Sequence, residues 1–351
     1  MQIEFEPFTL HKRHVLTISR GSSSQNTNVW VRVEAEGIEG WGEACPFAVD
    51  RQEQGLDSLL AALSVCQSLL SDYTPWQRQR IEQMLGEQQI PSAVRAALDM
   101  ALYDWLGKRT ATPLWQLWGF DIHRIPVTTV TIGISEPEVA QQRALAWMEQ
   151  IPGLQAFKVK LGSSVGIEAD QNMLIAIQEV IPIGSLLTVD ANGGWMVEDA
   201  LSMCQWLAGQ GVAYVEQPLE KGKEAGLITL WHQSPLPIFV DESCWESLDI
   251  PPLKDRIHGI NIKLMKSGGL TEALRMIHTA RAEGLQVMMG CYGNSALANT
   301  AAAHLTPLLD YVDLDSHLNV VDDPFTGATL EQGCLIPSTE PGLGVRRVDP
   351  A

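Results

Sequence analysis

Three short stretches of the chain, Val189-Asp190-Ala191-Asn192, Val215-Glu216-Gln217-Pro218 and Val240-Asp241-Glu242-Ser243, share one pattern. Each lies at the end of an apolar run and turns at once to an acidic residue. Apolar runs without internal alternation are typical of parallel strands that are covered on both faces. The pattern therefore predicts consecutive parallel strands whose carboxyl ends carry acids.

The same kind of apolar run recurs from about residue 125 onward, and a stretch with helical spacing follows each run. The runs are residues 127–133, 156–161, 186–190, 213–216, 238–241, 259–263, 286–290 and 311–315. Strands that alternate with helices indicate βα units, and about eight such units close a (β/α)8 barrel. An open doubly wound sheet is the alternative, but it needs a glycine-rich phosphate turn after its first strand, and Thr131-Ile132-Gly133-Ile134-Ser135 is not one. We predict an α/β fold with a (β/α)8-type barrel over residues 124–325.

Residues 1–123 differ from this region and predict an α+β capping domain, because strand patterns come first and helix patterns follow. Residues 29–35 alternate apolar and polar side chains, as in a half-buried antiparallel strand. The chain is expected to turn at Glu36-Gly37 and to resume the strand over residues 38–41.

Helical spacing in the capping region covers residues near 56–70 and 91–107. Gly107 follows the second apolar stripe and is the expected helix stop. The tail, residues 326–351, is rich in Gly and Pro, and we expect it to run back onto the capping domain.

The charge of the chain argues against two classes of partner. Lys plus Arg number 24 against 42 Asp plus Glu, which gives a net charge of −18. An acidic surface repels phosphate backbones and anionic membranes, so we expect neither nucleic acid nor membrane as a partner. No apolar run approaches the roughly 20 residues that cross a bilayer, and no signal-peptide pattern is visible. We expect a cytoplasmic protein.

Six cysteines are spread along the chain, and none forms a Cys-x-x-Cys pair. This spacing argues against a zinc knuckle or a redox motif. We expect free thiols in a reducing compartment.

Three acids at the ends of adjacent strands, Asp190, Glu216 and Asp241, would repel one another on one face of the barrel. A divalent cation removes that repulsion, and oxygen ligands favour Mg²⁺ over zinc. Any one of these acids alone could be a helix cap or a solvated loop charge. Three successive strands that end in acids favour the metal site.

The lysines need a different explanation. Lys158 and Lys160 share a face, because alternate residues of a strand point the same way. An inward lysine beside another ammonium and a metal has reason to favour its neutral form, and a neutral amine is a competent general base. Lys263 lies four strands further on, which is the opposite wall of an eight-stranded barrel. Two such bases suit proton removal from a carbon beside a carboxylate, with a metal stabilising the enediolate. Lys266 fits a surface charge better.

The order Lys-x-Lys, Asp-Ala-Asn, Glu-Gln-Pro, Asp-Glu-Ser and Lys-x-x-Lys-x-Gly-Gly resembles the muconate-lactonizing subgroup of the enolase superfamily. The resemblance spans nearly the whole chain and includes residues 93–101 and the closing Gly342-Leu343-Gly344-Val345. Lysine bases with Mg²⁺ are the established pattern of that superfamily.

The resemblance implies a function for each matching position. It implies that one Mg²⁺ ion is held by Asp190, Glu216 and Asp241. It implies that the two acid/bases are Lys160 and Lys263. Lys158 would support Lys160 and contact the substrate carboxylate.

The eighth strand discriminates among the reactions of the subgroup, which the fold alone cannot do. These reactions are muconate cycloisomerisation, dehydration to o-succinylbenzoate, N-acylamino acid racemisation and dipeptide epimerisation. Asp313 and Asp315 place two carboxylates at the barrel mouth, where an α-ammonium group would suit them. Only a dipeptide keeps such an ammonium, and this Asp-x-Asp resembles the dipeptide epimerases. The alternative is that one of these acids caps a following helix.

Residues 19–24 lie between two strand-like runs and have the composition of a mobile lid. Arg20 is the only base in this loop and could pair with an acidic substrate side chain. Thr131 ends the first strand and Cys291 follows the seventh, so both could line the pocket. Cys291 as a nucleophile is disfavoured, because no partner histidine is evident and the two nearby candidates, His304 and His317, fit structural positions.

We therefore predict a Mg²⁺-dependent isomerase that epimerises a dipeptide at the α-carbon of its C-terminal residue. The best match is L-Ala-Glu, which the resemblance links to murein peptides. An N-acylamino acid racemase or o-succinylbenzoate synthase is the first alternative. A non-catalytic barrel that binds a carboxylate through the metal is the second. The sequence leaves the number of subunits open, with a homo-oligomer as one outcome.

Overall fold

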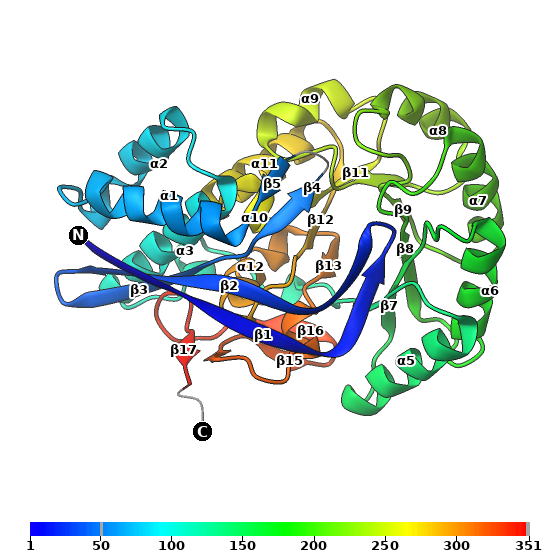
Figure 1. Ribbon diagram of the computed structural model, residues 1–351, viewed down its shortest axis with the longest axis horizontal. Coiled ribbons are helices and arrows are strands. Elements are labelled where there is room, and N and C mark those ends of the chain that lie inside the picture. The colour runs from blue at the N-terminus through cyan, green and yellow to red at the C-terminus, as the bar shows by residue number, and fades with distance from the viewer. Residues whose placement is uncertain (50–51, 349–351) are drawn as a thin grey trace.

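The structure, a computed structural model, describes residues 1–49 and 52–348, without the side chains of Gln52 and Glu53. Its centre is a parallel eight-stranded sheet in which the strands follow one another in chain order (Figure 1). The strands are β6 (Val130–Ile132), β7 (Ala156–Lys160), β8 (Leu186–Asp190), β9 (Val215–Glu216), β10 (Ile238–Val240), β11 (Gly259–Ile262), β12 (Gln286–Gly290) and β13 (Tyr311–Asp313).

The two ends of this sheet meet. Thr128, just before β6, forms a parallel bridge with Val312 on β13, and the Thr129 N–H donates to the Val312 carbonyl at 2.9 Å. This contact closes the sheet, so the predicted barrel is confirmed and the open doubly wound sheet is excluded.

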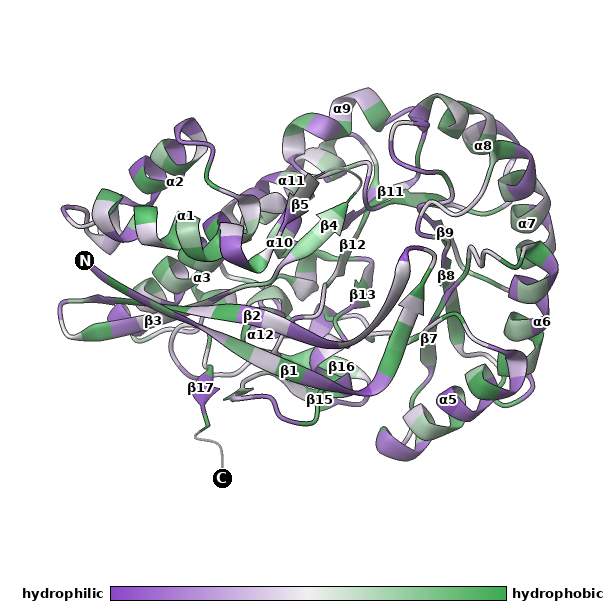
Figure 2. Cartoon of the chain, viewed as in Figure 1, coloured by the Kyte–Doolittle hydropathy of each residue, from purple (hydrophilic) through white to green (hydrophobic). Residues whose placement is uncertain are grey.

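Helices surround the barrel and connect its strands (Figure 1). They are α5 (Pro137–Gln150), α6 (Ile167–Gln178), α7 (Val197–Gly209), α8 (Leu227–Gln233), α9 (Ile250–Leu253), α10 (Leu264–Ser267), α11 (Leu270–Ala282) and α12 (Ala296–Ala303). The outer helices carry both hydrophobic and hydrophilic residues (Figure 2), as expected for helices with one face on a sheet and one in solvent.

The barrel interior is built in layers by the alternation of strand residues. Tyr214, Phe239 and Tyr311 pack ring against ring, with ring centroids 4.5–5.7 Å apart. The residues two positions further on are the acids Glu216, Asp241 and Asp313. Because residues i and i+2 of a strand point to the same side, an aromatic layer closes the barrel below a layer of acids.

The N-terminal region forms a three-stranded antiparallel sheet, β1 (Gln2–Ile18), β2 (Gly21–Ala35) and β3 (Ile38–Ala44), packed on helices. The helices are α1 (Leu56–Leu69), α2 (Arg78–Glu87), α3 (Ser92–Arg109) and α4 (Leu114–Leu117). A small hairpin, β4 (Phe47–Val49) and β5 (Gln52–Gln54), lies between the sheet and α1. A separate α+β capping region, as predicted from the sequence, is therefore present.

Strands β1 and β2 extend beyond this sheet as a long hairpin that reaches toward β7 and β8 (Figure 1). An irregularity in the pairing between His11 and Leu16 accompanies the bend. The predicted mobile lid over residues 19–24 is therefore the tip of a paired hairpin. Only Ser19 and Arg20 form the turn, and β2 already begins at Gly21.

The tail after β13 contains β14 (Phe325–Thr326), β15 (Thr329–Glu331), β16 (Cys334–Ile336) and β17 (Arg346–Arg347). It packs against α3 and α4: the Leu343 N–H donates to Asp104 Oδ1 at 2.8 Å, and the Gly342 carbonyl accepts from the Leu114 N–H at 3.1 Å. None of the helices among the described residues is long and apolar enough to cross a membrane. All six cysteines are free thiols.

The expectation that α3 stops at Gly107 is wrong, because the helix continues to Arg109. The glycine serves another purpose. A Cβ atom at Gly107 would lie 2.5 Å from the Gly342 Cα and 2.8 Å from the Thr112 carbonyl oxygen. The tail therefore approaches α3 closely only because position 107 has no side chain.

We predict that Gly107→Ala destabilises the protein by about 1–3 kcal/mol, although alanine is the better helix former, because the added carbon overpacks this contact. Gly86→Ala is the matched control. Gly86 lies in α2, and a Cβ atom added there would meet nothing within 4 Å, so this change should stabilise by about 0.5–1 kcal/mol. Urea unfolding measures both, and equal effects at the two positions would contradict the packing argument.

Candidate active site

Three acids lie at the carboxyl ends of neighbouring strands, as the sequence predicted. Asp190 and Glu216 are the last residues of β8 and β9, and Asp241 directly follows β10. All three are buried. Adjacent positions in the sheet pair Asp190 with Glu216, which sets the acids side by side.

Two lysines contact these acids from opposite walls. Lys160, at the end of β7, lies with Nζ 2.6 Å from Asp190 Oδ2. Lys263, directly after β11, lies with Nζ 2.6 Å from Asp241 Oδ2. Strands β7 and β11 are four positions apart in the eight-stranded sheet, so the two amines belong to opposite sides of the barrel.

Lys158 lies deeper than Lys160 and is fully buried. Its Nζ is 2.6 Å from Asp313 Oδ2, 2.7 Å from Glu216 Oε2 and 3.7 Å from Asp190 Oδ2. One ammonium group therefore links acids from three strands. This position beneath the acids is suited to holding carboxylates in place.

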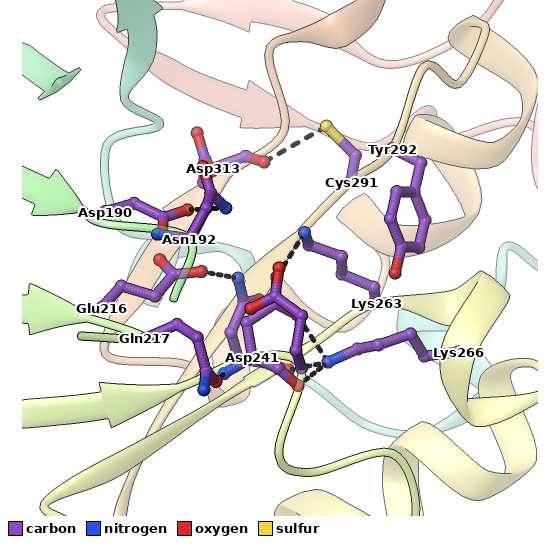
Figure 3. A network of polar contacts seen from close by, with 12 residues as sticks. Asp190, Asn192, Glu216, Gln217, Asp241, Lys263, Lys266, Cys291, Tyr292 and Asp313 are labelled. Carbon is purple, nitrogen blue, oxygen red and sulfur yellow. Dashed lines mark hydrogen bonds and ion pairs between the residues drawn. The ribbon is translucent and has the colours of Figure 1, made fainter. Parts of the chain in front are cut away.

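Lys266 is not the surface charge that the sequence suggested. It is buried, and its ammonium donates to Asp241 Oδ1 at 2.5 Å (Figure 3). It also donates to the carbonyls of Cys244 and Asn261 at 3.0 and 3.1 Å. The reason is the short helix α10, which begins at Leu264 and turns Lys266 back toward the strand ends. Lys263 and Lys266 therefore each bind a different oxygen of the Asp241 carboxylate.

Burial and neighbouring charges shift the pKa values of the three acids in different directions. Burial raises the pKa of Glu216 to about 7, and the Asp190 carboxylate adds to this rise. Burial also opposes ionisation of Asp190 and Asp241. There the ammonium groups, first those of Lys160 and Lys263, outweigh it and lower the pKa of each acid.

Two of the inward lysines do not show the expected shift toward the neutral form. Burial tends to lower the pKa of Lys158, but the carboxylates, Asp313 first, raise it well above its ordinary value. The pKa of Lys263 is likewise raised, because Asp241 outweighs burial. The nearest charges to both amines are carboxylates.

The acids fit Mg²⁺ by their chemistry, although they are turned toward the amines. In the part of the chain that the structure describes, no three acidic, histidine or cysteine side chains converge closely enough to hold a metal. Asp190 instead pairs with Lys160, and Asp241 pairs with Lys263. Part of the rise in the pKa of Glu216 comes from repulsion by the neighbouring acids. A cation among these oxygen ligands would relieve that repulsion.

Asp313 and Asp315 lie at the end of the last strand, β13. They accept hydrogen bonds from residues in and just before the first strand, β6. Asp315 Oδ2 accepts from the Thr131 N–H at 2.6 Å, and Asp313 Oδ1 accepts from the Thr129 hydroxyl at 2.9 Å. Neither side chain caps the short helix that begins at Ser316. Burial, with help from Asp313, raises the pKa of Asp315 to about 6.

The hairpin tip is tied to the barrel through Arg20. Its Nη2 lies 2.7 Å from Glu242 Oε1, and its Nη1 donates to the Asn192 carbonyl at 3.0 Å. The Ser19 hydroxyl donates to the same carbonyl at 3.1 Å. The tip therefore contacts the residues next to Asp190 and Asp241.

A cavity of 640 Å³ opens between the hairpin and the strand ends, within the size range of small-molecule sites. Its lining includes seven of the predicted residues and adds Lys12, Asn192 and Tyr292. The seven predicted residues are Arg20, Thr131, Lys160, Lys263, Cys291, Asp313 and Asp315. Two other cavities, of 520 and 820 Å³, contain none of the predicted site residues.

Cys291 lines the cavity without the surroundings of a nucleophile. Burial raises the pKa of its thiol to about 12, and its Sγ lies 3.4 Å from the Asp313 carbonyl oxygen (Figure 3). Burial also lowers the pKa of both histidines considered in the sequence, His304 and His317, to about 4. His304 Nδ1 accepts from the Trp115 N–H at 3.2 Å, which fits a structural position.

Besides Asn192, four residues of the site were not identified from the sequence. Lys266 and Asn261 hold Asp241 and Glu216, and the Asn261 side chain donates to Glu216 Oε1 at 2.7 Å. Tyr292 places its ring 4.6 Å from the Lys263 ammonium, and Lys12 lines the cavity. The second lysine of Lys-x-x-Lys was a usable signal for Lys266. Nothing local in the sequence marks the other three.

The chain matches two parts of a known enzyme group. Residues 5–119 match the N-terminal domain of the mandelate racemase / muconate lactonizing enzyme family, and residues 140–350 match the enolase C-terminal domain-like family.

Individual relatives are similar over almost the whole chain. A hydrophobic dipeptide epimerase from a Flavobacteria bacterium is 44% identical, over 98% of this chain and 97% of that one. An L-Ala-D/L-Glu epimerase from Bacteroides thetaiotaomicron is 35% identical, over 99% and 88%. The crystal structure of a dipeptide epimerase from Enterococcus faecalis, in complex with Mg and L-Leu-L-Tyr, is 31% identical, with a TM-score of 0.91 over 98% of each chain.

We predict that Lys266→Ala destabilises the fold by about 3–5 kcal/mol, because it leaves the buried Asp241 carboxylate without one of its two cations. Lys254→Ala is the matched control, since Lys254 pairs with Glu283 at the surface and its side chain is 44% exposed. That change should cost far less, because an exposed ion pair contributes little to stability. Guanidinium unfolding distinguishes the two, and a small loss at Lys266 would contradict its structural importance.

Proposed function

Because the chain belongs to the mandelate racemase / muconate lactonizing enzyme family of the enolase superfamily, we propose that it is a magnesium-dependent dipeptide epimerase. This isomerase would invert the α-carbon of the C-terminal residue. The observation that carries the proposal is the pair Lys160 and Lys263, which line one cavity from strands four positions apart. A binding protein has no need of two amines on opposite sides of its ligand.

Asp190, Glu216 and Asp241 would hold the Mg²⁺ ion. When bound, the ion would polarise the substrate carboxylate and stabilise the negative charge that develops beside the α-carbon. For the three carboxylates to converge, Asp190 and Asp241 must turn partly away from Lys160 and Lys263. That movement would free both amines for the substrate.

Proton transfer then needs one lysine in each protonation state. The neutral amine on one side takes the α-proton, and the ammonium on the other side delivers a proton to the opposite face. The product is the epimer, and the two lysines have exchanged protonation states. Lys158 and Lys266, which each contact carboxylates and do not line the cavity, would hold the acids in place.

Asp313 and Asp315 would bind the N-terminal ammonium of the dipeptide. Asp313 is already paired with Lys158, whereas Asp315 has no ammonium partner within 4.0 Å among the described residues. Asp315 is therefore the stronger candidate of the two. Thr131, whose N–H donates to Asp315, would orient its carboxylate.

The C-terminal side chain would be apolar. Arg20, which the sequence pattern assigned to an acidic substrate side chain, is occupied by Glu242. The hairpin residues beside it in the cavity, Leu16 and Ile18, are hydrophobic, and Phe47 adds a third apolar side chain to the lining. This wall is in keeping with the name of the Flavobacteria relative. L-Ala-Glu is the second candidate, and its binding would require Arg20 to leave Glu242.

Several sequence expectations stay predictions. They are the division into a capping domain (residues 1–123), a barrel (124–325) and a returning tail (326–351), together with a cytoplasmic location. The expectations of a homo-oligomer and of no nucleic-acid partner also stay predictions.

We predict that Lys160→Ala and Lys263→Ala each lower epimerisation of L-Ala-L-Leu by at least about 10³-fold, because each removes one of two obligatory proton carriers. Each variant should still exchange the α-proton of one epimer with D₂O, since the other lysine is intact. Mass spectrometry of the two separated epimers measures this.

An N-acetylated dipeptide is the control substrate. It lacks the ammonium for Asp313 and Asp315, so its turnover should be much slower than that of the free dipeptide. Equal turnover would favour an N-acylamino acid racemase. Full epimerase activity in either lysine variant would refute the two-base assignment.

A further inference from the structure

Four cationic side chains line the cavity, and three of them have a carboxylate partner. Arg20 pairs with Glu242 at 2.7 Å. Lys160 and Lys263 pair with their acids at 2.6 Å each. The fourth is Lys12, and no carboxylate lies within 4.0 Å of its Nζ in the described part of the chain.

Lys12 is held at the cavity wall by the hairpin. It lies on β1 within the irregular segment between His11 and Leu16, and its Nζ donates to the Ser23 hydroxyl at 2.9 Å. An ammonium has three N–H donors, so this contact leaves two for the cavity. The side chain is half-buried, and this burial lowers the pKa of Lys12. A partly desolvated cation with one neutral contact attracts an anion.

Lys12 and Arg20 serve different ends of the cavity. Arg20 contacts Glu242 and Asn192, close to the predicted metal ligands. Lys12 instead forms a backbone bridge with Val320, in the segment that follows β13. It shares the cavity lining with Asp315 and Cys291, which lie at the end of the barrel where β12 and β13 finish. Lys12 therefore lies at the end of the site that would hold the N-terminal residue of a dipeptide.

We propose that Lys12 determines specificity by binding an acidic side chain on the N-terminal residue, so that the preferred substrates are Glu-Xaa or Asp-Xaa dipeptides. This inference rests on the proposed function. The Asp315 carboxylate accepts from Thr131 and stays available for the α-ammonium of the same residue. An N-terminal glutamate presents both an ammonium and a carboxylate, which matches the acid Asp315 and the cation Lys12 that line the same cavity.

The test compares Glu-Leu with Gln-Leu, which have the same shape and differ in charge. A charge-assisted hydrogen bond contributes about 1.5–3 kcal/mol, so the wild type should favour Glu-Leu by roughly 10- to 100-fold in kcat/KM. Lys12→Met should abolish this preference while Gln-Leu is still epimerised. Lys12→Arg should retain it. Arg13→Met is the matched control, because Arg13 is the next residue of β1 and does not line the cavity, so this change should leave the preference unaltered.

The outcomes separate this inference from the proposed function. Equal turnover of Glu-Leu and Gln-Leu by the wild type would contradict the proposal that Lys12 determines specificity. The proposed epimerase function would be unaffected. A glutamate preference that survives in Lys12→Met also overturns it. If no dipeptide gains deuterium from solvent, the proposed function fails and this inference fails with it.

Discussion

Ion pairing between buried lysines and buried acids is the constraint on which the barrel mouth depends. Lys158, Lys160, Lys263 and Lys266 each contact one or more carboxylates at distances down to 2.5 Å. A buried charge without a partner would destabilise the fold by several kcal/mol. The four cations therefore match the four acids they touch: Asp190, Glu216, Asp241 and Asp313.

This balance also explains how the site could prepare for catalysis. The four lysines and four acids carry no net charge when all are ionised. A divalent cation held by the acids would make the set positive, which would favour the neutral form of an adjacent lysine. One neutral and one protonated lysine are the two forms that epimerisation requires. The same charges that stabilise the fold would thus set the protonation states for the reaction.

Strand periodicity connects this chemistry to the fold. The aromatic layer of Tyr214, Phe239 and Tyr311 closes the barrel, and the acids two residues further on form the layer above it. Each of these strands therefore supplies both a packing residue and a functional residue. The hairpin covers the acidic layer and brings Lys12 and Arg20 to the cavity.

Much of this arrangement could be predicted because it depends on local pattern. The strand runs and the residues at their ends placed Lys160, Asp190, Glu216, Asp241 and Lys263 on one face of a closed barrel. Contacts between distant segments could not be predicted this way. The pairing of Arg20 with Glu242 joins residues 222 positions apart. The hydrophobic pattern does not reveal the sharp turn of α10, so it predicts an exposed Lys266. It also predicts a helix stop at Gly107, because the neighbour of Gly107 in the fold, Gly342, is far along the chain.

Epimerisation by this site requires two amines that reach one α-carbon from opposite faces. The most direct measurement uses the unmodified protein with Mg²⁺ and an unlabelled dipeptide in D₂O, with the two epimers separated during the first turnovers. We expect the newly formed epimer to carry deuterium at its α-carbon from the start, because its proton comes from the second amine. A new epimer that retains the substrate's own α-hydrogen would show that one base serves both faces, and the two-amine mechanism would then be wrong.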